Sequence, residues 1–183
     1  MKKIVNLRDL LLAQASDLYN AELQQFTALP VLRDIAISTE LKKIIDRHIN
    51  ETRDQVARLD RVFHSVRKTV LARESTTIQS LVDQASELCE RCANPEVRDA
   101  AIITAIQHIN HYEIAGYGAS CTYANELNAN EIAETLHESL EEEKRMNTKL
   151  SLLARRKINA RAAQARHNSS KSHIALISLT GIY

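Results

Sequence analysis

Four glutamates stand inside stripes of apolar residues that recur every three or four positions along the chain. They are Glu22, Glu51, Glu113 and Glu143. The first two lie 29 residues apart with their midpoint at 36–37, and the last two lie 30 residues apart with their midpoint at 128. Residues equidistant from the turn of an antiparallel helical hairpin lie at the same height. With turns at these midpoints, each pair of carboxylates comes level and faces the same core.

Carboxylates gathered in a dry core favour one particular chemistry. Ionised glutamates there repel each other and lose hydration, at a cost of several kcal/mol for each unpaired ion. Either their pKa values rise and they stay protonated, or a cation holds them. Two divalent ions would balance four carboxylates, and an oxygen-rich site suits iron or manganese. The pattern predicts a two-ion iron or manganese site that can bind and activate oxygen species.

The elements that must position these glutamates are helices. The chain has 183 residues, with 24 Lys plus Arg against 23 Asp plus Glu, and only 3 Gly and 2 Pro. This length suits one domain, and so few turn-forming residues exclude a many-stranded β fold. Helical spacing predicts long helices at about 7–29, 39–66, 95–126 and 130–156, and a short one at about 76–92. We therefore expect an all-α, ferritin-like four-helix bundle of two hairpins, with the short helix in the crossover.

Four segments around the glutamates form a recognisable set. They are Asp17-Leu-Tyr-Asn-Ala-Glu22 with Ala28-Leu-Pro30, His48-Ile-Asn-Glu-Thr52 with Arg58-Leu59, His111-Tyr-Glu-Ile-Ala-Gly-Tyr-Gly118, and Leu140-Glu-Glu-Glu-Lys144. Over roughly residues 7–154 the chain resembles the YciE/YciF-type ferritin-like proteins, which are related to rubrerythrin. The resemblance implies a bacterial stress-associated homodimer with a di-iron centre and no established reaction. It also implies that the metal ligands are the four glutamates.

Three positions depart from the pattern of that family. Many members have His where this chain has Gln55, Glu where it has Asn110, and Asp where it has Asn147. An amide oxygen can still ligate a hard cation, but more weakly than a carboxylate or an imidazole. These three amides are weaker candidate ligands. His48 is another, although a core histidine with satisfied hydrogen bonds is the simpler interpretation of its place in the stripe.

Two interpretations of function from different classes remain open at this point. One is a metal-binding protein that handles iron, peroxide or oxygen under stress; the other is a non-catalytic helical dimerisation module with a vestigial site. Whether any enzyme activity is present stays undecided. Cys89 and Cys92 form a Cys-x-x-Cys pair, but a structural zinc site needs a second pair, which the remaining Cys121 cannot supply. Two incidental thiols are therefore favoured, and a redox-labile pair is an alternative.

The ends of the chain bear on compartment and partners. The bundle is predicted to span 1–156, and a basic and then apolar tail to span 157–183. A nucleic-acid contact through this tail is the weakest interpretation, because no aromatic residue or motif accompanies its charges. No apolar stretch is long enough to span a membrane, and the charged N-terminus does not suit a signal peptide. We expect a cytoplasmic protein.

Overall fold

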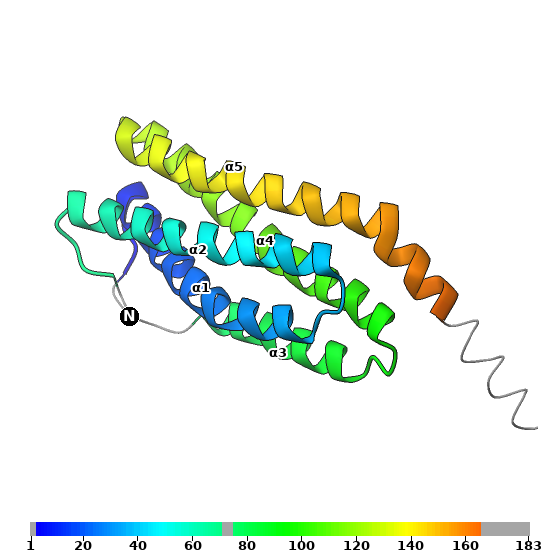
Figure 1. Cartoon of the computed structure of the whole chain (residues 1–183). Helices are drawn as coiled ribbons and strands as arrows, with labels where there is room; N and C mark the ends of the chain where they lie inside the picture. The colour runs from blue at the N-terminus through cyan, green and yellow to red at the C-terminus, as the bar shows by residue number, and fades with distance from the viewer. Residues whose placement is uncertain (1–2, 71–74, 166–183) are drawn as a thin grey trace, which may run out of the picture.

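The computed structural model describes residues 3–70 and 75–165. Within these ranges the chain is helical, and no strand is found. The helices are α1 (Leu7–Ile35), α2 (Thr39–Ser65), α3 (Thr76–Glu90), α4 (Pro95–Glu126) and α5 (Asn130–Leu153). Figure 1 shows the four long helices side by side, with α3 lying against α1 and α4. The predicted all-α bundle of two hairpins with a short crossover helix is confirmed.

Side-chain caps explain where the helices begin. Asn6, Ser38, Ser75 and Asn94 each accept a hydrogen bond from a backbone N–H in the first turn of α1, α2, α3 and α4. Each bond satisfies a donor that has no partner inside the helix. The turn between α4 and α5 contains Asn128 with a φ of 55°, a left-handed conformation that asparagine tolerates better than most residues. Both hairpin turns therefore fall at the midpoints of the predicted glutamate pairs.

Two predicted helix ends are wrong. Helix α1 continues through Pro30 to Ile35, although a proline removes one backbone hydrogen bond. Pro30 is exposed, while Leu29 and Leu32 on either side of it are buried, so their packing keeps this last turn helical.

The helical segment that starts as α5 also runs past 156. A π-helical turn at Ala154–Ile158 is followed by α-helix to residue 165, and the ribbon changes direction there in Figure 1. Such turns commonly bend a helix. The first part of the predicted tail is thus helical, and Lys157 in it forms an ion pair with Glu40 of α2. Residues 166–183, the rest of that tail, lie outside the described part of the chain.

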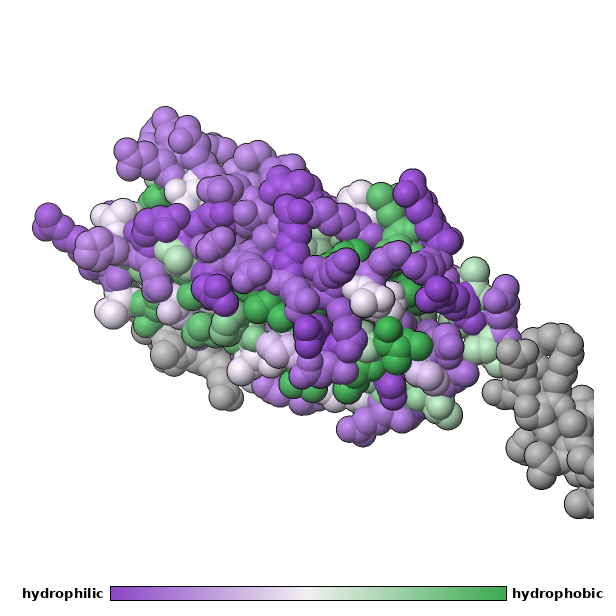
Figure 2. Space-filling model, viewed as in Figure 1, coloured by the Kyte–Doolittle hydropathy of each residue, from purple (hydrophilic) through white to green (hydrophobic). Residues whose placement is uncertain are grey.

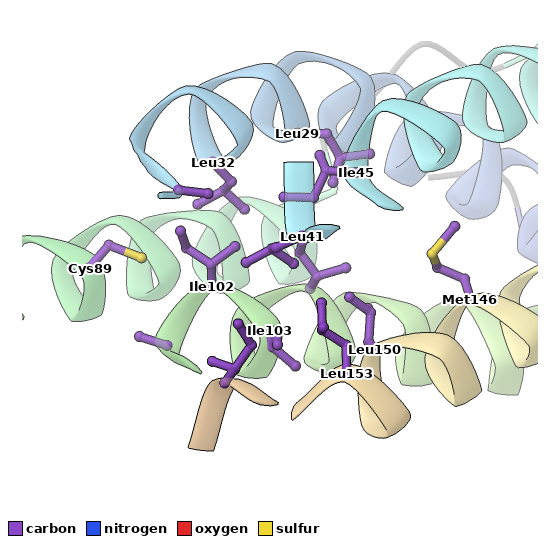
Figure 3. Close-up of a cluster of buried hydrophobic side chains, with 14 residues drawn as sticks. Leu29, Leu32, Leu41, Ile45, Cys89, Ile102, Ile103, Met146, Leu150 and Leu153 are labelled. Carbon is purple, nitrogen blue, oxygen red and sulfur yellow. The ribbon is translucent and has the colours of Figure 1, made fainter. Parts of the chain in front are cut away.

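Apolar side chains form two large core clusters, one toward each end of the bundle, and a small third one of Ala21, Ile78 and Ile109 from α1, α3 and α4. The first includes Leu29, Ile45, Ile102 and Leu150 and is drawn in Figure 3. The second includes Leu18, Leu59, Tyr117 and Leu136. On the inward face of each long helix the residues between these two sets are buried as well, and many of them are polar. The middle of the bundle is therefore a polar layer enclosed by two apolar ones.

Residues from α4 hold the turn between α1 and α2. Buried Asp99 accepts hydrogen bonds from the backbone N–H groups of Ile37 and Ser38, at 2.9 and 2.8 Å. Arg98 donates to the carbonyl of Ile35 at the end of α1. These contacts fix the positions of α1 and α2 along the bundle axis relative to α4. They therefore determine which side chains of the three helices lie level with one another in the polar layer.

The surface gives no sign of a spanning helix. The face shown in Figure 2 is mostly hydrophilic, with hydrophobic residues scattered over it. A search of the described residues found no helix that is both long and apolar enough to cross a membrane.

Candidate metal centre

Three of the four predicted glutamates meet in the polar layer. Glu22 of α1, Glu113 of α4 and Glu143 of α5 are all fully buried, with 0% exposure. Each comes from the inward face of its helix, where apolar neighbours three and four residues away carry it into the core. Helix α2 contributes a histidine to the same layer instead of the fourth glutamate.

The most compact part of the layer is the cluster of His48, Glu113 and Glu143. One ligand atom from each of these buried residues lies within 4.8 Å of the other two. His48 Nε2 is 3.5 Å from Glu143 Oε1, and neither ring nitrogen of His48 has a hydrogen-bond partner among the described residues. No described protein group satisfies the ring nitrogens of His48. An imidazole that faces two carboxylates is in position to share a cation with them.

Glu22 stands beside this cluster and has a partner of its own. The hydroxyl of Tyr117, also fully buried, donates a hydrogen bond of 2.7 Å to Glu22 Oε1. The second oxygen, Oε2, is buried and has no partner in the part of the chain that the structure describes. Tyr117 thus fixes one carboxylate oxygen and leaves the other available to a ligand.

Two glutamine amides complete the inner layer. Gln25 Nε2 lies 3.1 Å from both carboxylate oxygens of Glu113, and Gln55 Nε2 donates to Glu143 Oε1 at 2.9 Å. The amide oxygens of both glutamines are buried and unpartnered within the described ranges. Turning either amide over would present its oxygen to the carboxylate cluster, where it could bind a cation.

Two predicted site residues lie away from this layer. The side chain of Glu51 is 14% exposed at the edge of α2, and its Oε1 accepts a hydrogen bond of 2.8 Å from Arg47. Asn147 is half-buried, and its Oδ1 accepts a hydrogen bond of 2.8 Å from Gln107. Asn110, in contrast, is fully buried one turn before Glu113, and both atoms of its amide lack partners among the residues described.

Two carboxyl groups of this layer, those of Glu22 and Glu113, resist ionisation. Burial raises the pKa of Glu113 well above its ordinary value of 4.5, and the neighbouring carboxylates of Glu22 and Glu143 raise it further. Burial and then the charge of Glu143 likewise raise the pKa of Glu22. Without a cation, these two groups therefore favour their protonated forms.

An ion pair next to the layer joins α2 to α5. Arg58, 8% exposed at its side chain, donates to both carboxylate oxygens of Glu142 at 2.6 and 2.8 Å. It also donates to Glu138 and to Ser139 Oγ. The side chain of Glu142 is only 12% exposed. Arg58 pairs with this carboxylate through two hydrogen bonds.

Several buried polar atoms have no hydrogen-bond partner among the described residues. Among the described residues they are found on Glu22, Gln25, His48, Thr52, Gln55, Asn110, Ser120 and Glu143. Buried polar groups in folded proteins normally have partners, and leaving one unsatisfied costs about 1–3 kcal/mol. Several of these atoms belong to His48, Glu143 and the residues beside them, so a cation at this cluster would find donors that no described protein group engages.

The sequence pattern predicts the burial of some residues in this layer but not the contacts of others. Gln25 lies three residues after Glu22, so it falls on the same inward face of a helix. The pairing of Tyr117 with Glu22 joins residues 95 positions apart, and no local pattern reports such a contact. Elsewhere, Cys89, Cys92 and Cys121 are free thiols, so the structure contains no disulfide between the two closely spaced cysteines.

Comparison with known proteins agrees with this fold. The model of a domain of unknown function, DUF892, matches residues 6–163. Protein YciF of Escherichia coli (strain K12) is 36% identical over 157 residues, which cover 85% of this chain and 95% of that protein.

Solved structures give the same picture. The crystal structure of the E. coli stress protein YciF superposes with a TM-score of 0.81 at 35% identity, covering 85% of this chain and 99% of that one. YcfI, described as a putative structural protein from Rhodopseudomonas palustris, gives a TM-score of 0.79 at 37% identity, covering 82% and 96%. A protein from Xanthomonas campestris shares only the fold, with a TM-score of 0.69 at 19% identity over 90% of this chain and 99% of that one.

Proposed function

This chain belongs to the DUF892 family of YciF-like stress proteins, and we propose that it binds divalent iron or manganese in the polar layer of its bundle. The observation that carries the proposal is the buried cluster of His48, Glu113 and Glu143, whose ligand atoms lie within 4.8 Å of one another. A cation there would pair with carboxylates that otherwise face each other in a dry core.

The donor set favours these two metals. Carboxylate and amide oxygens with a single imidazole suit iron and manganese, whereas soft metals prefer thiolates. No cysteine belongs to the cluster found among the described residues. Glu113, Glu143 and His48 would hold the ion, and the amide oxygens of Gln25 and Gln55 are the nearest neutral donors.

The role that follows is the handling of iron, peroxide or oxygen under stress. Bound iron or manganese can bind and activate oxygen species. The residues of this chain would contribute a binding site that excludes water, and the hydroxyl of Tyr117 would hold Glu22 in place beside it. The apolar clusters above and below separate the ion from solvent.

A second candidate function is a non-catalytic helical dimerisation protein with a vestigial site. The observation that favours it is the set of neutral amides in the layer, because Gln25, Gln55 and Asn110 stand where charged ligands would bind a metal more tightly. We propose a cytoplasmic homodimer under either function, with no nucleic-acid or membrane partner. Sedimentation of a monomer at micromolar concentration would contradict the dimer.

Metal content and thermal stability distinguish the two candidates. Protein purified without chelator or affinity metal is analysed for iron and manganese, and melting is then followed with either metal added under anaerobic conditions. Metal that binds the native state alone stabilises it by roughly 2.7 kcal/mol at a hundredfold excess over the dissociation constant. A protein that carries no metal and gains no stability would support the dimerisation module.

Matched variants assign the effect to the layer. Glu113→Gln removes a buried carboxylate and should abolish the metal-induced shift, while leaving the metal-free protein as stable or more stable. Glu141→Gln is the control, because Glu141 is an exposed partner of Lys144 on the surface of α5. It should leave the shift unchanged. If Glu113→Gln destabilises the metal-free protein instead, the glutamates are core residues held by hydrogen bonds.

A further inference from the structure

We infer that the polar layer holds one metal ion per chain, bound by His48, Glu113 and Glu143, and not the two ions expected from four glutamates. The inference rests on the metal-binding function proposed above. It goes further by fixing how many ions the site takes and which residues do not serve as ligands.

The number of charged donors is the first argument. Ferritin-like two-metal sites use a Glu from each of two helices and a Glu-x-x-His from each of the other two, which makes four carboxylates and two imidazoles. Among the residues described here, one imidazole and two carboxylates converge. This set can hold one ion, with neutral amide oxygens or water completing its coordination.

The second argument is that the other two glutamates, Glu51 and Glu22, already have hydrogen-bond partners in the protein. Glu51 accepts a hydrogen bond from Arg47 at the edge of α2, with 2.8 Å between Oε1 and Nε. Glu22 remains in the layer, but one of its oxygens is held by Tyr117 at 2.7 Å. Around a second ion, Glu22 would be the main charged donor left, with a single uncommitted oxygen.

The third argument is that no histidine stands at the positions where a second imidazole ligand is expected. The positions three residues after the four glutamates are Gln25, Asp54, Gly116 and Met146. Asp54 is exposed and Met146 is fully buried in the apolar cluster of Figure 3. A Cβ placed on Gly116 would lie 2.8 Å from Leu18 Cδ2, so no side chain fits there without repacking. Gln25 is a neutral amide that already contacts Glu113.

Loading with manganese tests the number of metal ions that each chain binds. The whole chain is stripped with chelator, reloaded with excess Mn²⁺, separated from free metal and analysed for manganese per chain, and its electron paramagnetic resonance spectrum is recorded. We expect one manganese per chain and the hyperfine pattern of an isolated ion. Two ions per chain, or the spectrum of an exchange-coupled pair, would overturn the inference and leave the proposed function standing. A chain that retains no manganese would overturn the proposed function itself.

The same substitution on two helices provides the matched comparison. Glu143→Gln should reduce the manganese content well below one per chain, because it removes a ligand. Glu51→Gln should leave the content at one, because its carboxylate is bound by Arg47. Circular dichroism checks that both variants are folded. If Glu51→Gln lowers the content or affinity as Glu143→Gln does, then Glu51 is a ligand and the one-ion site is wrong.

Discussion

The two helical hairpins, α1–α2 and α4–α5, place different groups in the core although both carry a glutamate on each helix. From α4–α5 both glutamates, Glu113 and Glu143, reach the polar layer and are fully buried. From α1–α2 only Glu22 does so, and α2 contributes His48 while Glu51 pairs with Arg47 at the surface. One hairpin supplies two carboxylates, and the other supplies a carboxylate and an imidazole.

The difference shows that the height of a residue on a helix and the face on which it lies are separate properties. Successive residues turn by about 100° around a helix, so His48, Thr52 and Gln55 share the buried face of α2. Glu51 lies at the edge of that face, where its side chain is 14% exposed. There a surface arginine one turn earlier offers it a partner.

The largest effect that would test this comparison is expected from His48. His48→Leu removes the imidazole ligand and should weaken metal binding by at least about a hundredfold, or roughly 2.7 kcal/mol. The same change should leave the metal-free protein unchanged or more stable, because it removes two unpartnered buried nitrogens. Isothermal titration with Mn²⁺ and thermal melting measure the two effects.

The control for this variant is His111→Gln, which alters an exposed histidine on α4. It should change neither binding nor melting. Unchanged affinity in His48→Leu would mean that the α1–α2 hairpin contributes no imidazole ligand, and the contrast between the hairpins would then be one of packing alone.

The sequence permits prediction of the bundle and much of the layer, for physical reasons that differ between residues. Helix starts follow from caps such as Ser38 and Asn94, which act within one turn of the chain. The burial of Glu113 follows from apolar neighbours at helical spacing. The contact of Tyr117 with Glu22 and the pairing of Arg58 with Glu142 depend on how separate helices pack, so no local pattern reveals them.

The second expected effect contrasts two arginines of α2. Arg58→Ala leaves Glu142 partly buried without its bidentate partner, and breaking such a pair should lower the free energy of unfolding by about 3 kcal/mol. Arg47→Ala removes an exposed partner of Glu51 and should cost only about 0.3–0.5 kcal/mol. Urea unfolding measures both. Similar losses in the two variants would show that the link between α2 and α5 is no stronger than a surface pair.

The third expected effect is a difference in pH dependence between the metal-free and metal-bound protein. Burial and neighbouring carboxylates raise the pKa of Glu22 and Glu113 above 4.5 in the folded state. Their contribution to stability is therefore fully present below pH 4.5 and is lost as pH rises through the raised values. The metal-free protein should lose stability as pH rises from there toward neutrality, whereas metal binding should strengthen because protons no longer compete.

Denaturant unfolding at several pH values, with chelator or with Mn²⁺, measures these opposite trends. The double variant Glu22→Gln with Glu113→Gln has no such groups and should flatten the metal-free profile. If the metal-free protein is instead most stable near neutral pH and the double variant loses that maximum, the two carboxyl groups are ionised and satisfied in the core.

The smallest expected effect concerns a close contact between the two hairpins, where α4 packs against α1. Gly116 of α4 packs against Leu18 of α1, and a Cβ there would lie 2.8 Å from Leu18 Cδ2 and 3.3 Å from Cγ. Because Leu18 is buried in the apolar cluster beside Tyr117, it cannot move aside freely. Gly116→Ala should cost about 1 kcal/mol, as overpacking outweighs the gain in helix propensity. Gly118→Ala meets nothing within 4 Å and should stabilise the protein by about 0.5–1 kcal/mol. Thermal melting of the two variants should therefore shift in opposite directions, and two equal upward shifts would show that α1 and α4 have room between them.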